Sequence, residues 1–341
     1  LAEHYDTADF RFGACSHPDR DKDPAIWDME ARAMATAGIR YLRHGTSMGS
    51  VLNPDMCMKT ELFNGITAAF MKQGVERVAS VGYTTRWAMA DKSIDTRTPH
   101  AQAPDVAVWR EYVRKIFTHA RGKVRFWEVW NEADLPFFCA FPAETYAELA
   151  AIAREELDRV SPEASLMTSG FATVVSPDKG HFQRDALTLC KDLFDIHCFH
   201  GHGGFTGYVR LIDDQLLPLR RDLAMTIPWY AHETALTATG FGEDVQAEAL
   251  FKKLLFSWSR GSIGYTWYNL RNKGVNPNDA EHNYGLLTID FQPKPVYVAY
   301  NALIALYGAP GTCFVKQHAA PAGRWLLQFS NGREQLIAAW N

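Results

Sequence analysis

A chain of 341 residues, of which 47% are hydrophobic and 22% charged, is long enough to bury one large core. Its net charge of −4 is spread without a basic stripe, which argues against a nucleic-acid partner and favours small neutral or weakly charged ones. No apolar run approaches the roughly 18 residues of a membrane span, and the six cysteines form no CxxC pair, which argues against a zinc ribbon.

Short apolar or β-branched runs alternate with amphipathic stretches along most of the chain, and this alternation predicts βα units around a parallel sheet. Helical patterns cover 24–38, with Pro24 suited to the first turn and Gly38 to the C-terminal cap, and also 143–160. The eight predicted strands are 10–14, 39–44, 77–83, 124–130, 164–169, 193–200, 228–233 and 263–269. Eight such units predict an α/β fold, a closed (β/α)8 TIM barrel, with a doubly wound sheet as the alternative.

The last part of the chain changes character. Three short strand-like runs at 312–318, 324–330 and 335–340 are separated by PAG and NGRE, a pattern typical of antiparallel hairpins. Because so few short strands do not form a stable sheet alone, we expect residues 1–308 to form the barrel and residues 309–341 to form a small C-terminal antiparallel β appendage packed on it.

Functional side chains of a (β/α)8 barrel lie at the C-terminal ends of its strands. The fourth predicted strand ends at Asn131 and Glu132, and the seventh ends at Glu233. Since these strands lie on opposite sides of the barrel mouth, we expect the two carboxylates to face each other. Cleavage of a glycosidic bond requires such a pair, one group to protonate the leaving oxygen and the other to attack or to activate water. We expect Asn131 to contact the sugar hydroxyl next to the reacting carbon.

The stretch WEVWNEADLPFF (127–138) resembles the strand-four signature of clan A glycoside hydrolases and is most similar to glycoside hydrolase family 39. The resemblance implies a retaining O-glycosyl hydrolase that cleaves a β-linked, equatorial bond in an oligo- or polysaccharide without a cofactor. It implies Glu132 as the acid/base and a glutamate ending strand seven as the nucleophile. WYAHETAL (229–236) supplies that glutamate, Glu233.

Weaker matches extend the resemblance over nearly the whole chain. The catalytic pair is accompanied by these expected substrate-binding residues: Asn131, Arg43, His200, Trp267, Trp87 and His202. The two tryptophans are expected sugar platforms, since an aromatic face suits the apolar face of a pyranose. The sequence departs from the family at His202, because family members commonly carry a tyrosine shortly after the strand-six histidine, one that bonds the nucleophile.

Two neighbours of the glutamates are predicted to be structural. Glu128 lies an even number of residues before Glu132, so both side chains point to the same face of the strand. Glu128 lies deeper in the barrel, where pairing with an arginine is expected. His232 precedes Glu233, so strand alternation places its side chain on the opposite face, in a packing role.

The histidines of the H-x-x-H-x-H run at 197–202 could ligate zinc, but no carboxylate or cysteine motif accompanies them, so no metal site is predicted. The glycine-rich HGHGGFTG (200–207) is predicted to form a loop over the site.

Two other functions stay as alternatives. One is a catalytically inactive carbohydrate-binding barrel, favoured by the missing tyrosine, and the other is a metal-dependent barrel hydrolase that uses the histidines.

The sequence leaves open which sugar is cleaved, whether attack is at chain ends or inside, and the oligomeric state. It predicts neither a membrane nor a nucleic-acid partner. A start at Leu1 without a charged-then-apolar leader is compatible with a removed signal peptide and equally with a trimmed start. Localisation therefore stays open, with an extracellular or periplasmic location as the expectation.

Overall fold

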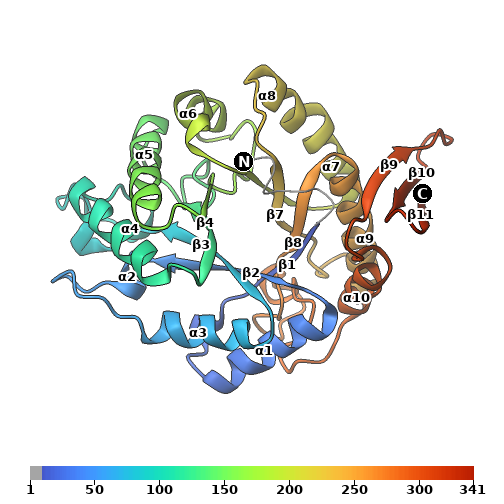
Figure 1. Cartoon of the computed structure of the whole chain (residues 1–341), viewed down its shortest axis with the longest axis horizontal. Helices are drawn as coiled ribbons and strands as arrows, with labels where there is room; N and C mark the ends of the chain where they lie inside the picture. The colour runs from blue at the N-terminus through green and yellow to red at the C-terminus, as the bar shows by residue number, and fades with distance from the viewer. Residues whose placement is uncertain (1–9) are drawn as a thin grey trace.

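The computed structural model describes residues 10–341, and eight parallel strands surrounded by helices form its larger part (Figure 1). The strands pair in the order β5-β4-β3-β2-β1-β8-β7-β6. Parallel bridges from Met167 to Ile196 and from Phe171 to Phe199 join the two ends of this order, so the ring closes. The barrel strands are β1 (Arg11–Cys15), β2 (Tyr41–Ser47), β3 (Glu76–Gly82), β4 (Val124–Val129), β5 (Ser165–Met167), β6 (His197–His202), β7 (Trp229–Ala235) and β8 (Ser262–Trp267).

The helices follow the strands as expected for a (β/α)8 barrel. The prediction for 24–38 is confirmed, because Asp23 caps the first helix by accepting from the Ala25 N–H and Gly38 ends it with a φ of 82°. The helices are α1 (Pro24–Ala37), α2 (Met48–Val51), α3 (Glu61–Lys72), α4 (Val106–Ala120), α5 (Ala143–Val160), α6 (Phe182–Cys190), α7 (Phe205–Arg210), α8 (Leu217–Asp222), α9 (Glu243–Ser259) and α10 (Pro295–Tyr307). All eight strand predictions and the helix at 143–160 are also confirmed, with ends that shift by a few residues.

A three-stranded antiparallel sheet follows the barrel and lies beside α9 and α10 (Figure 1). Its strands are β9 (Cys313–Gln317), β10 (Trp325–Ser330) and β11 (Gln335–Trp340). Aromatic contacts fix it to helix α9: the Phe329 ring lies 5.3 Å from that of Trp258, and the Trp325 ring lies 5.4 Å from that of Phe256. The predicted β appendage is confirmed, while its boundary at residue 309 stays a prediction.

The barrel interior is layered. Apolar side chains fill the part of the interior nearer the N-terminal ends of the strands; they are Val78, Phe126, Met167, Ile196, Cys198, Tyr230 and Ile263. Two residues further along the strands, Arg43 of β2, Glu128 of β4 and His200 of β6 form a polar layer that is nearly or fully enclosed. The chemistry-bearing residues therefore stand on a packed apolar floor at the C-terminal end of the barrel.

The predicted loop at 200–207 is wrong. Strand β6 continues through His202, and two residues, Gly203 and Gly204, separate it from α7. A side chain at Gly201 would place its Cβ 2.2 Å from the Tyr208 ring, so this glycine permits close packing of strand and helix.

Between residues 10 and 341, no helix combines the length and apolar character that a membrane crossing requires.

Candidate active site

A cavity of about 850 Å³ opens at the C-terminal end of the barrel, and the two predicted catalytic glutamates line it. Glu132 and Glu233 are each 8% exposed, so both carboxylates are largely withdrawn from solvent but reachable from the cavity. Arg43, Asn131 and His202 also line it. Buried carboxylates in a concave site with aromatic walls are typical of a place where small molecules bind and react.

The backbone after β4 turns sharply to present Glu132. Trp130 has a φ of 71° and Glu132 a φ of 45°, a left-handed conformation that costs non-glycine residues of the order of 1–3 kcal/mol each. Two contacts hold this turn: Trp130 Nε1 donates to the Phe138 carbonyl at 2.7 Å, and the Glu132 N–H donates to the Gly170 carbonyl at 3.2 Å. These two residues lower the stability of the fold, but they fix the position of the Glu132 carboxyl group.

Arg43 connects the predicted site residues. Its guanidinium donates to Glu233, to Asn131 Oδ1 at 2.6 Å, and to both oxygens of Glu128 at 3.0 Å each. Glu128 is fully buried and also accepts from the Gly170 N–H at 2.8 Å. The predicted pairing of Glu128 with an arginine is confirmed, and this pairing fixes the guanidinium beneath Glu233.

The two glutamates have opposite protonation preferences. Burial, reinforced by the nearby Glu233, raises the pKa of Glu132 to about 8. Burial alone would also raise the pKa of Glu233, but the His200 ring, the Arg43 guanidinium and the His202 ring hold it well below its usual range. At neutral pH one carboxyl group is therefore protonated and the other ionised, which suits an acid and a nucleophile at one site.

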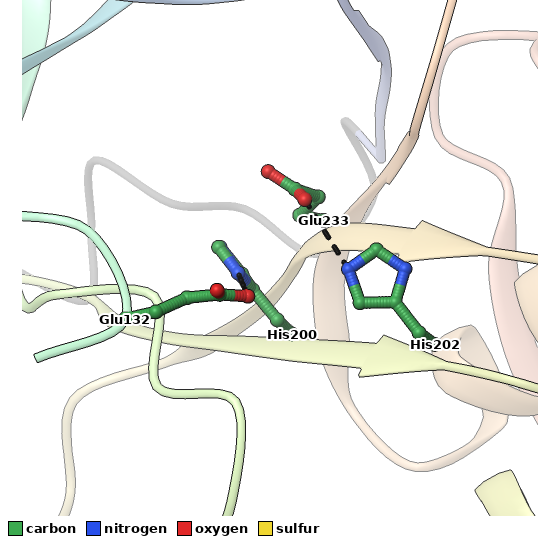
Figure 2. Close-up of side chains that lie close together, drawn as sticks. All are labelled: Glu132, His200, His202 and Glu233. Atoms are coloured by element: carbon green, nitrogen blue, oxygen red, sulfur yellow. Dashed lines mark hydrogen bonds and ion pairs between the residues drawn. The ribbon is translucent and has the colours of Figure 1, made fainter. Parts of the chain in front are cut away.

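Each glutamate has a histidine partner from β6, and Figure 2 shows the two pairs side by side. His200 Nδ1 lies 2.9 Å from Glu132 Oε1, and His202 Nε2 lies 3.2 Å from Glu233 Oε1. Burial lowers the pKa of His200 to about 4, so its ring is neutral at neutral pH and carries the charge that acts on Glu233 only at acid pH. His202 thus bonds the same glutamate that the tyrosine bonds in the family this sequence resembles.

His232 does not lie on the face opposite Glu233, so that prediction is wrong. The pairing of β6 with β7 shifts register between Phe199 and His200, and His232 is the extra residue, because Phe199 pairs with Ala231 and His200 with Glu233. A bulge of this kind breaks the alternation of a strand. His232 is fully buried, with Nδ1 3.7 Å from Glu128 Oε1, and burial lowers its pKa to about 4.

The two predicted tryptophan platforms do not reach the cavity. Trp267 is 0% exposed, lies in the hydrophobic core and donates from Nε1 to the Tyr284 carbonyl. Trp87 lies in a short 3-10 helix (Arg86–Ala88) and packs against the core without lining the cavity. Other side chains that sequence reasoning missed supply the aromatic and polar walls; they are Tyr83, Phe137, Phe138, Tyr268, Tyr284, His17 and His44.

Comparisons with known proteins agree with this fold. No family model and no curated protein matches the sequence. A solved family 39 glycoside hydrolase from the gut symbiont Bacteroides cellulosilyticus matches with a TM-score of 0.77 and 19% identity, over 98% of this chain and 71% of that one. A monomeric beta-xylosidase from Caulobacter crescentus matches with a TM-score of 0.72 and 16% identity, over 94% and 73% of the two chains.

A family 5, subfamily 18 glycoside hydrolase from Streptomyces cattleya, solved in complex with GlcNAc, matches with a TM-score of 0.67 and 14% identity, over 88% of this chain and 80% of that one. At such identities the likeness establishes the fold. The chain therefore has the (β/α)8 fold of clan A glycoside hydrolases, and in fold as in its strand-four motif it resembles family 39.

Proposed function

We propose that the protein is a retaining glycoside hydrolase that cleaves a β-linked, equatorial bond in an oligo- or polysaccharide. The observation that carries the proposal is the pairing of two buried carboxyl groups, Glu132 and Glu233, in one cavity, where the surroundings raise the pKa of the first and lower that of the second. An oxygen of each carboxyl group lies within 4.8 Å of the other. This favours retention, for which carboxyl groups stand about 5–5.5 Å apart, over inversion, which needs about 6.5–9.5 Å to admit a water.

The reaction follows from the two protonation states. Glu233 attacks the anomeric carbon while Glu132 gives its proton to the leaving oxygen, so that a covalent glycosyl-enzyme forms and the aglycone departs as an alcohol. In the second half Glu132, now ionised, takes a proton from water, and the resulting hydroxide equivalent displaces Glu233 from the anomeric carbon. Both groups return to their starting states, and no cofactor takes part.

Asn131 and Arg43 support this sequence of steps. Because Asn131 Oδ1 accepts from Arg43, its amide NH₂ group is the donor side; one N–H serves Tyr83 and the other donates to the sugar hydroxyl next to the anomeric carbon. Such a bond can strengthen as the transition state forms. Arg43 meanwhile keeps Glu233 ionised and fixed. Histidines 200 and 202 orient the two carboxyl groups.

The aromatic walls fit a sugar substrate. Tyr83 and Phe138 stack with ring centroids 6.2 Å apart at one side of the cavity. Tyr268 and Tyr284 lie on another, with ring centroids 5.4 Å apart. Aromatic faces bind the apolar faces of pyranose rings, so we assign the platform role to these four residues in place of the two tryptophans.

The test is product release from a panel of aryl β-glycosides and polysaccharides, starting with an aryl β-xyloside because of the similarity to a beta-xylosidase. Wild type and Glu233→Ala would be assayed in parallel, and NMR would identify the anomer that forms first. Release by wild type alone, with retained configuration, supports the proposal. Silence from both proteins, together with saturable glycan binding, would identify an inactive carbohydrate-binding barrel.

A further inference from the structure

The four side chains in Figure 2 form a cluster of metal-ligand types. Glu132 and Glu233 each offer a carboxylate oxygen, His200 and His202 each offer a ring nitrogen, and these four atoms all lie within 4.8 Å of one another. They come from three separate parts of the barrel: the turn after β4, strand β6 and strand β7. The rigid barrel therefore brings them together before any ligand arrives.

Two imidazole nitrogens and two carboxylate oxygens are a donor set that suits four-coordinate zinc. Because a ligating carboxyl group is deprotonated, binding would release the Glu132 proton, and the divalent cation would compensate the charge of both carboxylates. Glu233 can share one oxygen with a cation, because Arg43 and Cys15 contact its Oε2 while Oε1 faces His202. The contacts on Oε2 would hold the carboxylate in place as the groups around a metal commonly do.

We infer that this cluster is a binding site for Zn²⁺ or a similar transition-metal cation, and that the bound ion blocks the barrel mouth. His202 gives access, since its side chain is 36% exposed at the cavity wall, whereas the other three ligands are buried. The ion would occupy both carboxylates at once, so neither could donate a proton or attack a sugar. The inhibition, though not the binding, rests on the function proposed above.

A second group of potential ligands lies deeper and shares His200 with the first. Glu128, His200 and His232 also bring ligand atoms within 4.8 Å of one another. Both oxygens of Glu128 already accept from the Arg43 guanidinium, so neither is left for a cation, whereas Glu233 meets Arg43 through Oε2 alone and keeps Oε1 for one. The geometry therefore points to the cluster in Figure 2, where an oxygen of Glu132 and an oxygen of Glu233 each face a histidine ring.

Calorimetric titration of the whole chain with zinc chloride tests the binding. Wild type and His181→Gln, a matched control at an exposed histidine away from the cavity, should bind one ion with the same affinity. His202→Gln should bind at least about tenfold more weakly, because it loses a ligand. Equal affinity in His202→Gln and wild type, or no binding by wild type, would overturn the inference.

A second measurement separates a lost ligand from a lost fold. Cobalt(II) in a four-coordinate site absorbs visible light far more strongly than hydrated cobalt, so wild type should show this absorption and His202→Gln should not. Thermal denaturation of both proteins should coincide. A variant that unfolds early would be replaced by Glu132→Gln, which keeps the shape of the side chain and removes a charged ligand; unchanged cobalt absorption in that variant would contradict the site.

Inhibition is tested with the same ions. Zinc should inhibit glycoside hydrolysis competitively and reversibly on addition of a chelator, while magnesium at the same concentration should not, since it prefers six oxygen ligands. Zinc binding at the cluster without any glycosidase activity would refute the proposed function and leave the metal site standing. Glycosidase activity that is insensitive to zinc, with no heat of binding, would refute the metal site alone.

Discussion

Among residues 10–341, two arginine–glutamate pairs share one geometry, one pair buried and the other exposed, and a comparison of the two measures what burial contributes to stability. Glu128 accepts from Arg43 through two hydrogen bonds of 3.0 Å each, and Glu76 accepts from Arg125 through bonds of 2.7 and 2.6 Å. The Glu128 side chain is 0% exposed, whereas the Arg125 side chain of the other pair is 59% exposed. We predict that glutamine substitutions at the two glutamates have very different costs.

Glu128→Gln should lower the free energy of unfolding by about 1–3 kcal/mol, the usual cost of leaving buried hydrogen-bonding groups unsatisfied, because Arg43 keeps Glu233 as a counter-charge. Glutamine keeps the shape but has one acceptor oxygen, so it cannot serve Arg43 at two positions and the Gly170 N–H as well. Its NH₂ group would instead face a donor. Glu76→Gln should cost about 0–1 kcal/mol, because solvent screens an exposed pair.

Urea unfolding of wild type, Glu128→Gln and Glu76→Gln at neutral pH measures both costs. Equal losses from the two substitutions would refute the reasoning. The pH dependence gives an independent check: burial would raise the pKa of Glu128, but Arg43 and His232 lower it to about 2. The stabilisation from Glu128 should therefore be complete above its unfolded pKa of 4.5 and be lost as the pH falls toward 2.

Other changes test the roles of the residues at the mouth. Wild-type kcat/KM should fall as the pH rises through about 8, where Glu132 loses its proton, and a flat profile across that range would contradict its role. Glu132→Gln should lower kcat about 10²–10⁴-fold for poor leaving groups and far less for activated aryl glycosides, as steady-state rates on both substrate types would show. Gly170→Ala should abolish activity, since the new Cβ would lie 1.9 Å from His200 Nε2, while Gly204→Ala, with open space around it, should match wild type in the same assay. Treatment with EDTA should leave the hydrolysis rate unchanged, and a loss restored by added metal would favour a metal-dependent hydrolase.

The barrel could be predicted from the sequence because its strands and helices are locally distinct. Strand β4 (Val124–Val129) is rich in β-branched and aromatic residues, and α1 carries both a first-turn proline and a capping glycine. The run at 200–207 was harder to interpret, since glycines are typical of loops. Here Gly201 lies inside a strand because Tyr208 packs where a side chain would be, a tertiary contact that local pattern does not reveal.

The catalytic pair could be predicted because strand ends in a barrel converge whatever the loops do. The residues that line the cavity walls could not be predicted, since they depend on which way each side chain points. Trp267 and Tyr268 are adjacent at the end of β8, yet the tryptophan packs in the core and the tyrosine lines the cavity. His232 was misplaced for a related reason, because a bulge in β7 adds one residue and cancels the alternation on which the prediction depended.

The roles of the two glutamates are the central claim, and rescue by azide tests them most directly. With an activated aryl β-glycoside and sodium azide, Glu233→Ala should yield the α-glycosyl azide, because azide takes the place of the missing nucleophile and attacks once. Glu132→Ala should yield the β-glycosyl azide, because azide attacks a glycosyl-enzyme already formed on Glu233. NMR of the products distinguishes the two. The same configuration from both variants, or the opposite assignment, would contradict the account.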